Sequence, residues 1–276
     1  MIMKNILSCP VCKAEIYRDE KSYFCTGEKK HCFDISSAGH INLCPGKATG
    51  GDDKHAVRSR TEFLNLGYYL PISKKICEIL SDLDEGSNVV DAGCGEGYYS
   101  NNIAKNSKAS VWGFDLSKEA IISASKSTKR QGISNSMFFV GGIYDIPVRD
   151  ASVDVVTNIF APCCEKEFSR VLKNGGRFVA VVAGKEHLLG LKRAIYENVY
   201  TNEERADMPR NMRLLEKHNV KYTVTIDGAE AIRNLFSMTP YSYRTSEKDY
   251  EKLMALTSLT TEVDVDIYVY RKDDVV

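Results

Sequence analysis

Residues 88–99 read Asn-Val-Val-Asp-Ala-Gly-Cys-Gly-Glu-Gly-Tyr-Tyr, and this stretch decides the fold of most of the chain. An apolar strand is expected first, glycines follow at Gly93, Gly95 and Gly97, and a helix is expected to begin near Tyr98. A strand that turns through glycines into a helix is typical of a nucleotide-binding loop, because the backbone can approach the ligand closely. A dinucleotide fingerprint needs glycine at position 98, so the Tyr there disfavours NAD.

The alternating pattern Asp91-x-Gly93-x-Gly95-x-Gly97 is similar to the first motif of class I S-adenosylmethionine-dependent methyltransferases. The resemblance implies that the glycine backbone packs on the methionine moiety of the cofactor. The first amides of the following helix, from Glu96 to Tyr99, can then face the methionine carboxylate.

A second strand is expected over residues 109–115, and it ends in Asp115, twenty positions after Gly95. A carboxylate at that point accepts both ribose hydroxyls of a bound nucleoside. Many class I methyltransferases carry Asp at the place of Gly142 to bind the adenine amine, and this chain does not. Backbone atoms or Asp145 would have to make that contact instead.

Strands and helices alternate through the remainder, which predicts an α/β fold with a mostly parallel, Rossmann-like sheet. Helices are expected at 54–66 and 117–129, and further strands at 137–140, 154–162 (with the loop over the transferred methyl group) and 177–182. Residues 222–226 and 263–270 alternate in polarity and predict a late antiparallel pair.

The N-terminal cysteines predict a metal site. Cys9 and Cys12 are followed after twelve residues by Cys25 and after five more by His31, which is the spacing of two ligand pairs around tetrahedral zinc. Zinc would supply the folding free energy that so short a segment lacks. The adjacent Cys32 could replace His31 as fourth ligand, although we prefer His31.

Composition sets limits on other functions. The 37 basic and 37 acidic residues cancel, which argues against a uniformly basic nucleic-acid binder. Residues 1–75 carry 12 basic and 8 acidic residues, whereas residues 222–276 carry 6 and 10, so a polyanion should meet the N-terminal end. The longest uncharged run, residues 131–144, is too short and too polar for a membrane span, and no secretory signal is visible, so a cytoplasmic location is expected.

Taken together, these features predict three parts. Residues 1–45 form a small zinc-binding domain, residues 46–75 a linker and bridging helix, and residues 76–276 the S-adenosylmethionine-dependent methyltransferase domain. RNA recognition by residues 1–45 is implied only by the family resemblance that follows.

Over essentially its full length the chain resembles the bacterial 23S ribosomal RNA guanine-N1 methyltransferases, the RlmA family. The resemblance rests on a set of short motifs: Cys9-Pro-Val-Cys12, Tyr23-Phe24-Cys25, His31-Cys32-Phe33-Asp34, Gly39-His40-Ile41-Asn42-Leu43, Gly51-Asp52, Ser59-Arg60, Phe63-Leu64, Asp91 to Tyr99, Phe160-Ala161-Pro162, His187-Leu188 and Met238-Thr239-Pro240. It implies methyl transfer from S-adenosylmethionine to guanine N1 in a 23S rRNA hairpin loop, and it allows a homodimer built through the N-terminal module.

The resemblance adds Tyr69 and His187 to the residues expected against the cofactor. The full set of predicted cofactor-binding residues is Tyr69, Gly93, Gly95, Glu96, Gly97, Tyr98, Tyr99, Asp115 and His187.

Guanine N1 carries a proton at neutral pH, so a polar acceptor must receive it. Asp52, in the glycine-rich linker, is our first catalytic candidate, and Glu165 the second. Because N1 lies on the Watson–Crick edge, the target must be unpaired and everted. We expect four basic residues to contact RNA phosphates: Lys29, Lys30, Arg58 and Arg60.

Two rival functions remain open at this point. A small-molecule methyltransferase with a purely structural zinc domain predicts turnover on a metabolite and no retention of RNA. A zinc-containing RNA-binding protein that no longer uses the cofactor predicts no binding of S-adenosylmethionine, but the intact glycines and Asp115 argue against it.

Overall fold

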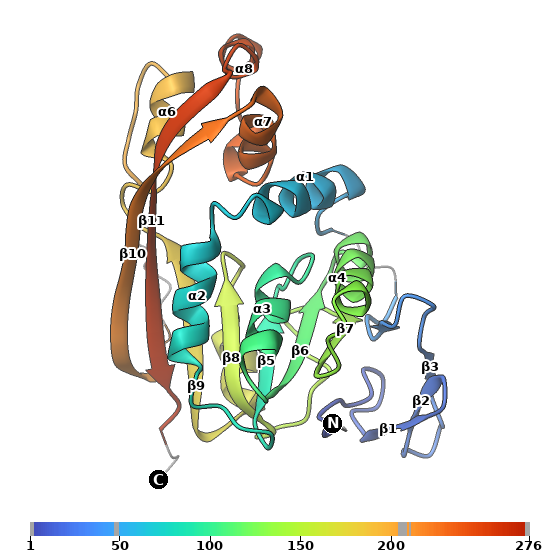
Figure 1. The fold of residues 1–276 in the computed structure, drawn as a ribbon. Helices are drawn as coiled ribbons and strands as arrows, with labels where there is room; N and C mark the ends of the chain where they lie inside the picture. Colours follow the sequence, from blue (N-terminus) through green and yellow to red (C-terminus); the bar gives the residue numbers. More distant parts are fainter. Residues whose placement is uncertain (1–2, 47–49, 204–208, 210, 274–276) are drawn as a thin grey trace.

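The structure is a computed structural model that describes residues 3–46, 50–203, 209 and 211–273. Residues 47–49 of the predicted linker lie outside the described residues. A small three-stranded sheet lies beside one edge of a large eight-stranded sheet (Figure 1). The small sheet has the order β1-β2-β3 and consists of β1 (Ile16–Asp19), β2 (Ser22–Cys25) and β3 (Cys32–Asp34).

The large sheet contains the seven strands that the sequence predicted and one more, the short strand Ile41–Asn42. In chain order they are β4 (Ile41–Asn42), β5 (Asn88–Ala92), β6 (Ser110–Asp115), β7 (Ser136–Val140), β8 (Val153–Ile159), β9 (Leu172–Ala183), β10 (Arg213–Asp227) and β11 (Ser258–Arg271). Their order across the sheet is β10-β11-β9-β8-β5-β6-β7-β4. The strands from β4 to β9 pair in parallel, whereas β11 is antiparallel to β9 and β10 to β11. This confirms the predicted α/β, class I methyltransferase fold with its late antiparallel pair.

Successive residues of the central strands point to opposite faces of the sheet, as a pleated strand requires. Val89 and Val155 belong to the hydrophobic cluster on one face, and Val90 and Val156 to the cluster on the other. The first face is covered by α2 (Leu70–Ile79) and α3 (Tyr98–Asn106), with α4 (Lys118–Arg130) beside them (Figure 1). The second face receives α5 (Glu165–Val171) through Phe168.

The apolar residues of the N-terminal ribbon, which we define as residues 3–46, do not form a core of their own. Ile6, Leu7, Ile16 and Ile41 are buried in the same cluster as Trp112 of β6. In addition, β4 pairs with the outer strand β7 of the large sheet. The ribbon is therefore continuous with the second face of the sheet.

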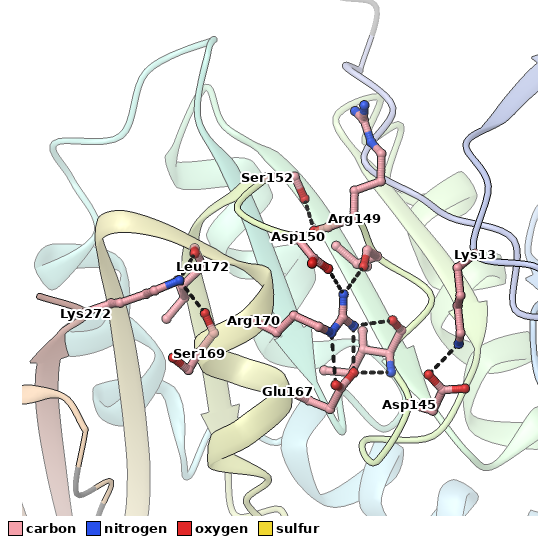
Figure 2. A network of polar contacts seen from close by, with 12 residues as sticks. Lys13, Asp145, Arg149, Asp150, Ser152, Glu167, Ser169, Arg170, Leu172 and Lys272 are labelled. Atoms are coloured by element: carbon pink, nitrogen blue, oxygen red, sulfur yellow. Dashed lines mark hydrogen bonds and ion pairs between the residues drawn. The ribbon is translucent and has the colours of Figure 1, made fainter. Parts of the chain in front are cut away.

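A polar network fixes the ribbon to the segment 145–150 (Figure 2). Figure 2 shows that Lys13, after Cys12, forms an ion pair of 2.5 Å with Asp145. Arg149 also pairs with Glu15 of the ribbon at 3.1 Å. From α5, Arg170 donates to the carbonyls of residues 146 and 148 and pairs with Asp150 at 2.6 Å. The segment that carries the ribbon is thus itself anchored to the sheet domain.

The remaining helices lie above the carboxyl end of β8 in Figure 1. They are α1 (Lys54–Asn65), α6 (Leu189–Ile195), α7 (Ala229–Ser237), the short 3-10 helix η1 (Pro240–Tyr243) and α8 (Glu247–Met254). Phe63 of α1 and Phe236 of α7 belong to the first-face cluster, so α1 packs between α7 and the sheet. Among the described residues, no helix has the length and apolar character that a bilayer crossing requires.

Candidate functional site

Four metal-ligating side chains meet in the ribbon. Cys9 and Cys12 lie in the turn before β1, Cys25 ends β2, and His31 precedes β3. The Sγ atoms of Cys9, Cys12 and Cys25 lie 3.4, 3.6 and 3.5 Å from His31 Nδ1, and the four ligand atoms lie within 4.8 Å of one another. Tetrahedral zinc with thiolate and imidazole ligands has ligand–ligand distances of about 3.5 to 3.8 Å, so the four residues fit this ion.

The adjacent His31 and Cys32 face different ways. His31 Nδ1 turns toward the cluster, whereas the exposed Cys32 has its Sγ 3.8 Å from Asp34 Oδ1. Burial raises the pKa of the Cys25 thiol, but hydrogen bonds from His31 and from the Gly27 amide outweigh it and lower the pKa to about 6. A lowered pKa favours the thiolate, which is the form that binds metal.

The glycine loop joins β5 to α3 where the order of strands in the sheet reverses, which is where open α/β sheets bind ligands. Gly93, Gly95 and Gly97 have φ angles of 77°, 55° and 78°, a region that side chains disfavour. A Cβ at Gly93 would lie 2.6 Å from Ala161 Cβ, and one at Gly97 would lie 2.8 Å from Ala124 Cβ. Only glycine fits at positions 93 and 97.

Asp115 lies beside the loop at the end of β6. Its Oδ2 accepts from the Gly95 amide at 3.1 Å, and its Oδ1 accepts from the Ser117 amide at 2.8 Å. Burial raises the pKa of Asp115, and these two hydrogen bonds oppose that shift. The carboxylate is therefore held in one orientation at the position that binds ribose hydroxyls in nucleotide-binding α/β folds.

A guanidinium from α1 lies over the glycine loop. Arg60 forms an ion pair with Asp52, and its Nη1 lies 3.6 Å from Glu96 Oε2. A Cβ on Gly95 would approach the same Nη1 to 3.2 Å. Burial opposes the charge of Arg60, but Glu96, Asp52 and Asp115 raise its pKa overall.

Glu96 is an unusual carboxylate because its side chain is only 6% exposed. Its Oε2 accepts no hydrogen bond from the described residues. Burial raises the pKa of Glu96 to about 7, while Arg60 acts in the opposite direction. A cationic group of a ligand would find an unsatisfied acceptor here.

The predicted pair of phosphate-binding arginines is wrong for Arg60. Arg58 is exposed and pairs with Glu62 one turn along α1, whereas Arg60 turns inward onto the glycine loop. Residues two apart on a helix lie about 200° apart around its axis, so an exposed Arg58 leaves Arg60 facing the sheet.

The two candidate proton acceptors lie in different surroundings. Asp52 is ion-paired with Arg60, and its backbone carbonyl accepts from Ser117 Oγ at 2.6 Å, so it lies at the glycine loop. Glu165 is in the first turn of α5, where its Oε1 accepts from the Asn211 amide at 2.8 Å.

Tyr69 and His187 lie next to each other and next to Phe160, which is in the loop after β8. The Tyr69 hydroxyl lies 3.3 Å from His187 Nε2, and the amide of Asp264 donates to His187 Nδ1 at 3.3 Å. Burial lowers the pKa of His187 to about 4, so the ring is neutral at physiological pH. The rings of Phe160 and His187 stack, with centroids 5.9 Å apart.

The other residues predicted near the cofactor lie at the start of α3 and on the segment that holds the ribbon. Tyr98 and Tyr99 pack edge to face at 5.0 Å at the start of α3, and the buried Tyr99 hydroxyl has no hydrogen-bond partner among the described residues. Asp145 forms its ion pair with Lys13 of the ribbon. Around Gly142, by contrast, an added Cβ would meet no atom within 4 Å.

Known proteins match both parts of this arrangement. Residues 83–236 match the family model described as a methyltransferase domain, and residues 7–49 match the one described as the N-terminal part of RlmA, a zinc ribbon. The chain is 31% identical, over 97% of its length and 98% of the relative's, to YxjB of Bacillus subtilis (strain 168), a provisionally named 23S rRNA (guanine-N(1)-)-methyltransferase. The chain belongs to the RlmA family. It is thus an S-adenosylmethionine-dependent methyltransferase with a zinc ribbon, as the sequence predicted.

A second relative agrees with membership of the RlmA family, and a solved structure agrees with the fold. The 23S rRNA (guanine(748)-N(1))-methyltransferase of Streptomyces fradiae is 28% identical over 70% of this chain and 69% of its own. The solved Haemonchus contortus phosphoethanolamine N-methyltransferase 2 aligns with a TM-score of 0.52 at 13% identity, covering 80% of this chain and 58% of that one. At this identity the structural likeness supports the fold alone.

Proposed function

We propose that this RlmA-family protein transfers a methyl group from S-adenosylmethionine to N1 of an unpaired guanine in a hairpin of 23S rRNA. The observation that carries the proposal is the similarity to YxjB, which spans the ribbon and the sheet domain together. A ribbon with four converging ligands and a glycine loop at the carboxyl end of β5 are the two parts that such an enzyme needs.

The proposed zinc ligands are Cys9, Cys12, Cys25 and His31. Three thiolates and one imidazole make a closed tetrahedral set, which is the form of a structural zinc site and leaves no position for a reacting water. The metal would therefore shape the ribbon rather than take part in methyl transfer.

The proposed cofactor site, which we call the cofactor crevice, is the glycine loop of residues 93–97 with its flanking residues. Bound S-adenosylmethionine supplies an electrophilic methyl group on a sulfonium ion. Gly93, Gly95 and Gly97 let the loop turn with positive φ angles and pack closely on its neighbours. Asp115 is oriented to accept from ribose hydroxyls, and the buried Glu96 offers an acceptor to a cationic group. Tyr69, Tyr98, Tyr99 and His187 complete the proposed set of cofactor contacts. Positioning is the main requirement, because the displacement neutralises charge instead of creating it.

Asp52 is the proposed acceptor of the guanine N1 proton. It lies at the glycine loop, its side chain is 29% exposed, and the ion pair with Arg60 fixes its orientation. An Asp52→Asn variant should keep cofactor affinity and lose turnover at neutral pH, where guanine N1 carries its proton. The loss should become smaller at alkaline pH, where the base loses that proton without help.

The proposed RNA-recognition domain comprises residues 1–45 and so includes nearly all of the ribbon. Lys29 and Lys30 are exposed in the loop between Cys25 and His31, and Arg58 is exposed on α1. Contacts of these groups with phosphates would release counterions, so RNA affinity should fall as salt is raised. An affinity that stays flat would argue against this role of the ribbon.

The direct test uses methyl-labelled S-adenosylmethionine and an unmodified 23S rRNA transcript. We expect label to enter the RNA and to appear, after digestion to nucleosides, as 1-methylguanosine alone. Label in another nucleoside would contradict the assignment to N1. Turnover of a metabolite with no transfer to RNA would establish the rival small-molecule methyltransferase.

Two further proposals concern the assembly and the location. A homodimer built through the N-terminal module predicts a mass near twice 30.9 kDa by light scattering, and a single-chain mass would rule it out. A cytoplasmic location follows from the proposed rRNA substrate, and cell fractionation tests it.

A further inference from the structure

Phe160 has a backbone conformation that a bulky side chain rarely adopts. Its φ angle is 53°, in the left-handed region, and it directly follows the last residue of β8. The residue is nevertheless 41% exposed, so burial does not offset this cost. Strain of this kind persists only where surrounding contacts hold it, and it concentrates at ligand sites.

The contacts that hold Phe160 also tie it to the cofactor crevice. Its amide donates to the Val181 carbonyl at 3.0 Å. The side chain of Asn158 donates to the carbonyls of Ala92 and Pro162 at 3.1 and 2.9 Å, which fixes the start and the end of the loop. The next residue, Ala161, lies so close to Gly93 that a Cβ there would clash with it.

One side of the Phe160 ring is supported by other aromatic rings. It stacks on His187 with an interplanar angle of 20° and lies 6.4 Å from the ring of Tyr69. His187 is neutral and fixed by hydrogen bonds at both ring nitrogens. The exposed part of the Phe160 ring therefore rests on a rigid, uncharged support next to the glycine loop.

We propose that Phe160 is the platform on which the everted guanine stacks while it receives the methyl group. Everted bases are held in proteins by stacking on aromatic side chains, because every base has a π-face. The position suits this role, since the loop after β8 touches the loop that carries the cofactor. The inference rests on the proposed function and adds to it the residue that holds the target base.

The test compares Phe160→Leu, which removes the aromatic face, with Phe160→Tyr, which keeps it. Tyr250→Leu on α8 is the matched control, because Tyr250 is 45% exposed and far from the loop in sequence. Each variant is assayed for kcat and KM with the 23S rRNA transcript, and for S-adenosylmethionine affinity by calorimetry.

We expect Phe160→Leu to lower kcat/KM for RNA about tenfold or more, as removal of one base-stacking ring does elsewhere, while cofactor affinity stays within about twofold. Phe160→Tyr and Tyr250→Leu should behave as the wild type. An unchanged kcat/KM in Phe160→Leu would overturn the inference. A parallel loss of cofactor affinity, or an equal loss in Phe160→Tyr, would overturn it as well, since a packing role predicts those results.

A second measurement reports stacking directly. The guanine that primer extension identifies is replaced by 2-aminopurine, whose fluorescence is quenched by an aromatic partner. Quenching on binding that is lost in Phe160→Leu, and kept in Phe160→Tyr, supports the platform, whereas equal quenching in all proteins contradicts it. A wild-type enzyme that leaves RNA unmodified would instead reject the proposed function, and this inference with it.

Discussion

In the ribbon, four side chains from two loops converge on one point, whereas at the proposed cofactor site the glycine backbone after β5 packs directly against Ala161 in the loop after β8. The ribbon has little core of its own, because Ile6, Leu7 and Ile41 pack against the sheet domain. The crevice, by contrast, is built on two complete hydrophobic layers.

The two regions should therefore be disrupted by different substitutions. The ribbon's local structure depends on a ligand set, so it should be lost when one ligand or the metal is lost. The crevice depends on the absence of side chains and on a few oriented charges, so it should be lost when atoms are added or when Arg60 is removed.

The largest effect is expected from the metal ligands. Cys25→Ser should release zinc and unfold the loops, since structural zinc contributes about 10 to 16 kcal/mol of apparent folding free energy in zinc-finger peptides. Hydrogen exchange should show loss of protection between Cys9 and His31, while β4 stays protected through its pairing with β7. Cys32→Ser is the control and should keep one zinc per chain by elemental analysis. Zinc retained in Cys25→Ser, or lost in Cys32→Ser, would contradict the ligand set.

The next largest effect is expected at the glycine loop. Gly93→Ala places a Cβ 2.6 Å from Ala161 in a residue with a φ of 77°, so the two loops must separate. We expect at least a roughly hundredfold loss of S-adenosylmethionine affinity, in line with a cost of about 3 kcal/mol for combined overpacking and backbone strain.

Gly132 supplies the matched control, because its φ is 65° and a Cβ there would meet no atom within 4 Å. Gly132→Ala should lower the free energy of unfolding by about 1 kcal/mol and leave cofactor affinity unchanged. Similar calorimetric titrations for the two variants would show that the close approach at Gly93 does not shape the site.

A smaller effect separates Arg60 from Arg58. Arg60→Gln leaves Asp52 and Glu96 without their cation, so we expect about a tenfold loss of cofactor affinity and a lower melting temperature. Arg58→Gln should change neither and should only weaken RNA binding. Calorimetry and thermal melts on both variants test this, and equal behaviour of the two would refute the inward orientation of Arg60.

The smallest effect is a pH dependence set by Glu96. Its folded pKa of about 7 lies above the unfolded value, so this group's contribution to the free energy of unfolding falls as pH rises from about 4.5 to 7. A cationic cofactor favours the ionised carboxylate, so S-adenosylmethionine affinity should rise by up to about tenfold from pH 6 to 8. Glu96→Gln should remove this dependence, and a pH dependence unchanged by that substitution would assign it to another group.

The sequence alone predicts well those features that physical chemistry ties to residue spacing. Tetrahedral zinc needs two ligand pairs, and a close approach to a cofactor needs glycine, so both patterns are visible without a structure. The alternation of strands and helices likewise predicts the sheet. The sequence does not decide whether His31 or Cys32 is the fourth zinc ligand, because this depends on the path of the loop after β2.

Other features depend on contacts between distant segments, which spacing does not encode. Arg60 belongs to the crevice because α1 packs beneath α7, and Asp145 is paired because the ribbon docks on its segment. The pattern of exposed and buried positions along α1, with Val57, Phe63 and Leu64 apolar, could have indicated that Arg60 and Arg58 face different ways. No sequence signal predicted the backbone strain at Phe160.

The most direct test of the central claim is primer extension on 23S rRNA from a strain that lacks this protein. A methyl group on guanine N1 blocks base pairing and stops the polymerase. We expect a stop at one hairpin guanine in the parent strain and no stop in the deletion strain. The stop should return with the wild-type protein, but not with the Cys25→Ser or Gly93→Ala variant. A stop that persists in the deletion strain would contradict it.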